Sequence, residues 1–169
     1  MKTLIKGGPD WHNDVNENFE EVTTQLSDLT NNKANKTDLI ICEEGTWIPK
    51  IAGNVIAGSN SYAAQVGTYA KIGKSVTINF QIDVTLGTTI GGEIYIINLP
   101  FVAKNIAIGN IGICSIVNNG SITQFSILTV ANYNSLVLRK INVNGTYNNI
   151  KNTDLGTTLN IVGSITYQI

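Results

Sequence analysis

The chain has 169 residues, of which 43% are hydrophobic; this content excludes general disorder and allows one compact domain with an appendage. No apolar run approaches the roughly 18 residues of a membrane span, and the polar start MKTLIKGGPDWHND lacks the pattern of a signal peptide, so we expect neither a membrane partner nor export. The net charge is −1 and the longest basic cluster is Arg139-Lys140, which argues against nucleic acid as the main partner.

Charge also divides the chain into two parts. Up to Glu44 there are nine acidic residues and four lysines, whereas the 125 residues from Gly45 onward hold three acids and seven bases. The second part is instead rich in Asn, Thr, Ser, Gly, Ile and Val. We therefore expect a helical stalk with its linker over residues 1–44 and a head over residues 45–169.

The stretch WHNDVNENFEEVTTQLSDLTNN, residues 11–32, predicts an amphipathic helix with Asp10 as its N-cap. Its apolar residues follow one another at steps of four, three, four and three, the spacing of positions a and d in a coiled coil. The acidic residues fall on the outer positions b, c and f, while positions e and g are polar and uncharged. Identical helices can therefore lie parallel without like charges meeting. We assign oligomerisation to the apolar stripe, which has Phe19 and Leu26 at position a and Val15, Val22 and Leu29 at position d.

Two packing partners are considered for this apolar stripe. An ordinary helix would pack it on the head's own sheet, but such helices usually have a broader apolar face. We favour another copy of the same helix, with Lys33 and Lys36 ending the seam at the next a and d positions. The heptads alone do not select a trimer over another oligomer. A helix of fewer than three heptads is marginal alone, so we expect the heads to associate as well.

The head shows strand signals at the spacing of an all-β sandwich. The clearest is SVTINFQIDVTL, residues 75–86, in which apolar and polar residues alternate. Turn sequences separate the candidates, including NNGS at 118–121 and VNGTYNN at 143–149. The pattern predicts a mainly β fold, a jelly-roll-like antiparallel sandwich after a single helix. The other strand candidates are 46–51, 63–72, 93–99, 106–117, 122–130, 135–143 and 158–168.

Three phrases carry a resemblance: EEGTWIPKIAG, QVGTYAKIGKSVTINFQIDV and GGEIYIINLPF. They resemble the head domain of receptor-binding proteins at the tail tips of phages and prophages of low-GC Gram-positive bacteria, and DWHNDVNENFEEV resembles the helix that often opens such proteins. The resemblance extends to about Phe101 and fades beyond it. It implies a homotrimer with stalk helices on the threefold axis, located in the virion. The implied partners are other tail or baseplate proteins and host cell-wall polysaccharide or teichoic acid.

Catalysis and cofactor binding have little support in the sequence. His12 is the only histidine and lies in the stalk, so the head has no Ser-His-Asp or Cys-His arrangement. Glycosidase chemistry needs two carboxylates, for which the head offers only Asp83, Glu93 and Asp154. Asp83 belongs to a polar strand face and Glu93 follows a glycine turn, so surface solvation explains both. Cys42 and Cys114 are too few for a disulfide framework or a zinc site, and we expect plain thiols. We therefore expect no enzyme activity, metal or cofactor.

Two late loops rich in asparagine are the candidate ligand site. Sugar sites commonly combine amides and hydroxyls with an aromatic platform, because sugars present hydroxyl groups and weakly apolar ring faces. The loops ANYNSLVLRK and NGTYNN supply both kinds of group. The alternative is that their asparagines only provide turn geometry. The candidate ligand-binding residues are Asn132, Tyr133, Arg139, Tyr147 and Asn148.

Overall fold

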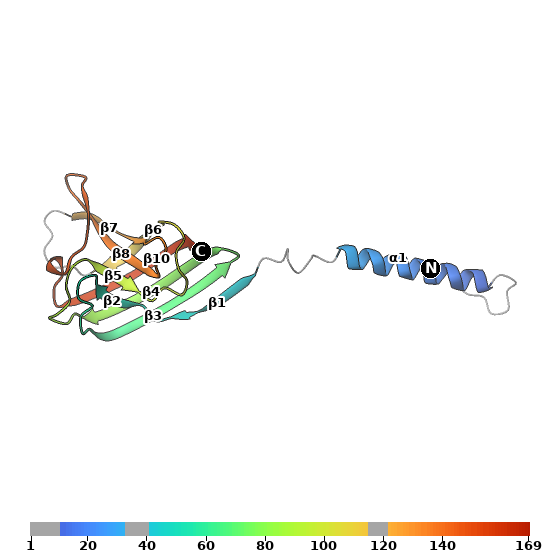
Figure 1. Cartoon of the computed structure of the whole chain (residues 1–169), viewed down its shortest axis with the longest axis horizontal. Helices are drawn as coiled ribbons and strands as arrows, with labels where there is room; N and C mark the ends of the chain where they lie inside the picture. Colours follow the sequence, from blue (N-terminus) through green and yellow to red (C-terminus); the bar gives the residue numbers. More distant parts are fainter. Residues whose placement is uncertain (1–10, 33–40, 115–121) are drawn as a thin grey trace. The chain divides into compact units, whose positions relative to one another are not determined.

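The structure, a computed structural model, describes residues 11–32, 41–114 and 122–169, and forms two units, Met1–Ile40 and Ile41–Ile169. Helix α1 (Trp11–Asn32) has the predicted bounds (Figure 1). Asp10, Lys33 and Lys36, proposed to cap the helix and end its seam, lie outside the described residues, as does the NNGS turn. No helix in the described ranges is long and apolar enough to cross a membrane. The division at Ile40 precedes the expected one, because strand β1 already begins at Cys42.

The β unit is built from antiparallel strands and one short 3-10 helix, η1. In chain order these are β1 (Cys42–Trp47), β2 (Lys50–Gly53), β3 (Ser61–Ile72), β4 (Ser75–Thr85), β5 (Ile94–Ile97), β6 (Ile108–Cys114), β7 (Ile122–Thr129), β8 (Ser135–Asn142), β9 (Tyr147–Asn149), η1 (Asn152–Asp154) and β10 (Thr158–Gln168). The mainly β prediction with one N-terminal helix is confirmed. Strands β3 and β4 form a hairpin whose two-residue turn begins at Gly73, where φ is +58°.

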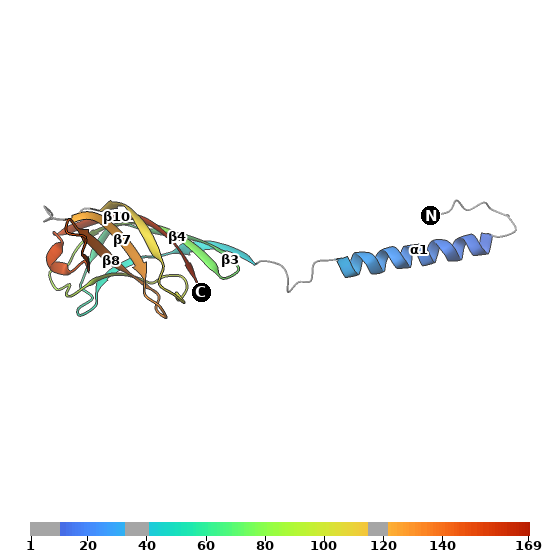
Figure 2. The same ribbon diagram turned by 90° about the horizontal axis from the view of Figure 1, so that it is seen from above.

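The sheet is curled. Its strands follow the order β1-β3-β4-β10-β6-β7-β8-β5-β2, with β9 added to β8. The two strands at the ends of this path, β1 and β2, are joined by only Ile48 and Pro49, so the two edges of the sheet must come close together. Figure 2 shows the long strands β3, β4 and β10 from a second direction.

The core lies inside the curl. The apolar residues of the alternating stretch on β4, from Val76 to Val84, are all buried, as the period of two predicts. They belong to one cluster with side chains from the opposite half of the sheet, including Ile96 on β5, Ile127 on β7 and Leu138 on β8. One face of each half is therefore covered by the other half.

Two strand predictions need correction. The stretch 46–51, expected to be one strand, is divided at Ile48 and Pro49, because proline has no N–H to donate to a ladder. In the second case, the predicted turn at residues 143–149 ends in strand β9, which pairs with β8 from Arg139 to Ile141. Part of the predicted ligand loop is thus an edge strand.

The two cysteines lie far apart in the sheet. Cys42 begins β1, where it is exposed, and Cys114 ends β6. Strands β3, β4 and β10 lie between β1 and β6. Four strand spacings amount to about 19 Å, measured along the sheet, whereas a disulfide needs Cα atoms within roughly 7 Å.

We therefore expect the melting temperature to be independent of reductant. An intrachain disulfide between these two strands would require the sheet to break. Differential scanning calorimetry with and without dithiothreitol checks this, with non-reducing electrophoresis of fresh protein alongside. A large drop in melting temperature on reduction would show that a disulfide supports the fold.

Candidate functional site

The structure separates the predicted ligand residues into two places. Tyr133 lies in the turn before β8, and Tyr147 lies on β9, opposite Ile141 near the other end of β8. Ile141 lies six residue steps along β8 from Ser135, which corresponds to about 20 Å. One small sugar cannot contact both tyrosines.

The turn at Tyr133 has a clear structural role. Asn132 adopts φ of +66°, a left-handed conformation that asparagine tolerates better than most residues. Its N–H donates to the Ala103 carbonyl at 2.7 Å, and the Ala103 N–H donates to the Tyr133 carbonyl at 3.0 Å. Asn132 therefore serves turn geometry, as in the alternative explanation, while the Tyr133 side chain remains 63% exposed.

The structure brings Arg139 and Tyr147 together. The half-buried Arg139 guanidinium carbon lies 4.7 Å from the centroid of the Tyr147 ring, within the range of a cation–π contact. The Tyr147 side chain is 65% exposed. An exposed ring held by a cation on one side is a suitable platform for the apolar face of a sugar.

Three residues outside the predicted ligand set, one of them in the predicted loop NGTYNN, extend this pair into a hydrogen-bonded cluster. The Arg139 Nε donates to Asn149 Oδ1 at 3.4 Å, and Asn149 Nδ2 donates to Glu93 Oε2 at 2.9 Å. The Tyr95 hydroxyl donates to the same Glu93 oxygen at 3.3 Å. We call Glu93, Tyr95, Arg139, Tyr147 and Asn149 the arginine cluster.

Electrostatics fix the protonation of Tyr95 in this cluster. Burial raises the pKa of Tyr95, and the neighbouring Glu93 carboxylate raises it further. The hydroxyl therefore stays protonated at neutral pH and acts as a donor. Within the described residues, the arginine cluster thus combines a cation, a carboxylate, an amide and two phenol rings, which can donate to and accept from sugar hydroxyls.

Asn148 belongs to the opposite face of β9. It pairs with Lys140, whereas Tyr147 and Asn149 pair with Ile141 and Arg139, and side chains alternate along a strand. Lys140 itself forms an ion pair of 2.7 Å with Asp154. Asn148 therefore cannot share a ligand surface with Tyr147 unless β9 rearranges.

The predicted oligomerisation residues are largely exposed within the helical unit. Exposure is 68% for Phe19, 61% for Leu26 and 67% for Leu29, while Val22 is 42% exposed and Val15 is half-buried. Burying an apolar side chain of this size gains about 1.5–3 kcal/mol. The stripe is thus available to a partner helix.

The comparisons with known proteins identified no relative of this chain. No family model matches the chain, and none of the curated proteins or solved structures compared with it is a match. Function therefore has to be inferred from the residues and their geometry.

Proposed function

We propose that the chain is a receptor-binding protein of a phage tail or phage-tail-like particle, and that it adheres as a homotrimer to carbohydrate on the host cell surface. Three α1 helices form a parallel coiled coil, and the β units form jelly-roll-like heads. The protein resides at the tail tip or baseplate of the virion and contacts other tail proteins. The heads contact cell-wall polysaccharide or teichoic acid.

The observation that carries this proposal is the exposed apolar stripe of α1. A single helix of 22 residues gains little stability alone, so the stripe needs a partner. Its flanks suit an interface because the hydroxyls of Thr23 and Thr30, at e positions, donate to the Phe19 and Leu26 carbonyls at 2.7 Å. These groups can be buried between helices without losing a hydrogen bond.

Assembly also supports adhesion. A site built on one exposed tyrosine and a few polar groups binds a sugar weakly, but linked sites gain avidity of about 10²- to 10⁴-fold. The arginine cluster supplies such a site on each head. A stalk that joins several heads thus turns weak binding into firm attachment.

Loss of the Tyr147 ring should weaken attachment while leaving the fold intact. We expect Tyr147→Ala to cost about 1–3 kcal/mol per site, because it removes the platform and the contact with Arg139. Tyr147→Phe keeps the ring and should bind nearly as well as the parent. Binding of labelled protein to host cells checks this, with sedimentation and melting temperature as controls.

The second tyrosine is tested separately. Tyr133→Ala should also weaken attachment, because a long polysaccharide can contact both ends of β8, which lie about 20 Å apart, whereas one sugar cannot. Should both alanine variants bind cells like the parent, neither loop belongs to the ligand site.

Two other functions are distinguished by one experiment. The head of a structural baseplate or tail-fibre component would contact only protein, and a depolymerase would cleave the polysaccharide. We expect the intact protein to bind purified cell-wall polysaccharide without releasing reducing ends. Absence of binding would favour the structural component, and release of reducing ends would favour the depolymerase.

A further inference from the structure

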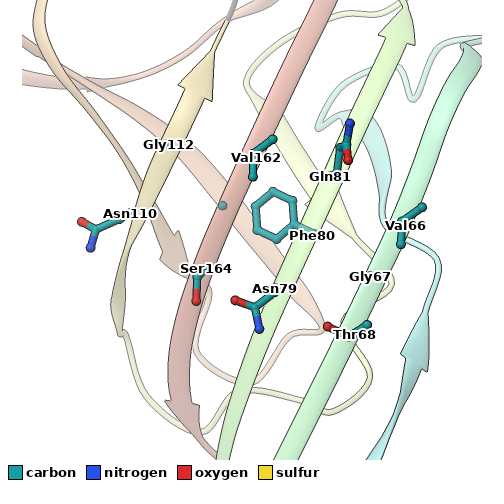
Figure 3. Close-up of a pocket in the computed structure, with 11 residues that line it drawn as sticks. Val66, Gly67, Thr68, Asn79, Phe80, Gln81, Asn110, Gly112, Val162 and Ser164 are labelled. Atoms are coloured by element: carbon teal, nitrogen blue, oxygen red, sulfur yellow. The ribbon is translucent and has the colours of Figure 1, made fainter.

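A second polar surface lies on the outer face of the sheet, away from the arginine cluster. It is a hollow of about 430 Å³ across β3, β4, β10 and β6 (Figure 3). We call it the outer hollow. Its floor is one register row formed by Gly67, Phe80 and Gly163, which are all buried and lie between two rows of outward-facing side chains.

The two rows that border the outer hollow differ in character. One row is polar and crosses four strands as Thr68, Asn79, Ser164 and Asn110. The other places Gln81 between the exposed Val66 and Val162. Rows two residues apart on a strand are about 7 Å apart, and four strands span about 14 Å. The outer hollow is therefore a trough with four hydrogen-bonding side chains on one side and one amide flanked by two apolar side chains on the other.

The polar side chains of this trough form no hydrogen bonds with other described residues. Among the described residues, the side chains of Thr68, Asn79, Gln81, Asn110 and Ser164 make no hydrogen bond. In the next row, by contrast, the hydroxyls of Thr77 and Thr166 bond each other at 2.8 Å. Three amides and two hydroxyls thus point to the outer face with both donors and acceptors available.

The trough continues towards β1. A second hollow, of about 460 Å³, shares Thr68 and Asn79 and reaches Glu44 and Thr46. Among the residues that the structure describes, none that lines the outer hollow is charged, and Glu44 is the one charged residue of the second hollow. An anionic ligand would meet no cation here and would be repelled at one end, whereas a carboxylate can accept hydrogen bonds from hydroxyls.

We propose that the outer hollow binds an uncharged glycan chain that runs across β6, β10, β4 and β3 towards β1. The amides and hydroxyls bind its hydroxyl groups, and Val66 and Val162 contact the apolar faces of its rings. The inference rests on the proposed adhesion function and adds a sugar class to it. The outer hollow selects neutral sugars, while the arginine cluster offers a guanidinium suited to anionic substituents.

The test uses the intact protein and simple sugars as probes. Methyl glucoside, methyl galactoside, methyl rhamnoside and methyl glucuronide are titrated to tens of millimolar concentration, and the side-chain amide signals are followed by two-dimensional NMR. We expect at least one neutral glycoside to shift the signals of Asn79, Gln81 and Asn110. The glucuronide should bind more weakly than the glucoside.

Two variants address the outer hollow directly. A Cβ on Gly112 would meet only the Val162 carbonyl oxygen, at 3.5 Å, so Gly112→Phe can be accommodated and would occupy part of the outer hollow. Gln81→Glu replaces a donor by a charge. Both should weaken neutral-sugar binding about tenfold. The matched control Gln124→Glu, on an exposed part of β7, should stay within about twofold.

Several results would overturn this inference. The first is that no probe shifts the NMR signals of the side-chain amides. The second is that the protein binds the glucuronide more tightly than the glucoside, and the third is that Gly112→Phe binds neutral sugars like the parent. A change of oligomeric mass in Gly112→Phe would instead identify the face as a contact between copies. If Gly112→Phe binds as the parent and Tyr147→Ala does not, only the outer hollow is excluded and adhesion stands. If the parent binds neither the glycosides nor wall polysaccharide, the proposed function fails as well.

Discussion

Phe19→Asp is expected to dissociate the assembly into single chains at micromolar concentration. The substitution places one carboxylate per chain at an a position of the stripe, where each copy would face the same charge. Burying an unpaired charge costs on the order of several kcal/mol, which exceeds what a short seam provides. Because Phe19 is 68% exposed within its unit, the fold of the single chain should not suffer.

A matched variant separates this effect from helix propensity. Thr24→Asp introduces the same residue in the same helix at position f, on the outer face of the heptads. We expect it to sediment like the parent. If Phe19→Asp assembles as well as Thr24→Asp, the heptad register is wrong.

Gly67→Val is expected to destabilise the β unit by about 3 kcal/mol. Gly67 faces the core, where a Cβ would lie 2.6 Å from Trp47 Cδ1. The indole cannot easily move, because Trp47 is only 7% exposed and packs edge-on to Phe80 with 6.0 Å between ring centroids. Valine at position 67 must therefore displace a ring of the core, and thermal or urea unfolding measures the cost.

Gly112 provides the control for this substitution. It too is a strand glycine, but its Cβ position has room next to the Val162 carbonyl. Gly112→Val should therefore change the unfolding free energy by less than about 1 kcal/mol. Equal destabilisation by the two variants would mean that loss of glycine itself, rather than the packing of Trp47, matters.

The helix and the strand with the clearest periodic patterns in the sequence were predicted correctly. Heptad spacing predicted α1, and the alternation from Val76 to Val84 identified both β4 and its buried face. The pairing of distant strands has no such local pattern. The sequence does not show that β1 and β2, two residues apart, lie at opposite ends of the sheet.

The candidate site shows the same limit. Arg139 and Tyr147 were found because aromatic and basic residues occur in asparagine-rich segments, and the structure places them in contact. Glu93 was interpreted as a solvated residue after a glycine turn, since nothing near it in sequence suggests a partner. It meets Asn149 only because β5 and β9 pair with the same edge of β8.

The most direct test of multivalent adhesion compares the parent with Phe19→Asp on immobilised cell-wall polysaccharide. Both proteins carry the same heads, so their intrinsic sites are equal. The account predicts that the parent dissociates at least about 100-fold more slowly, because several linked sites must release together. Equal dissociation rates for parent and variant would contradict it.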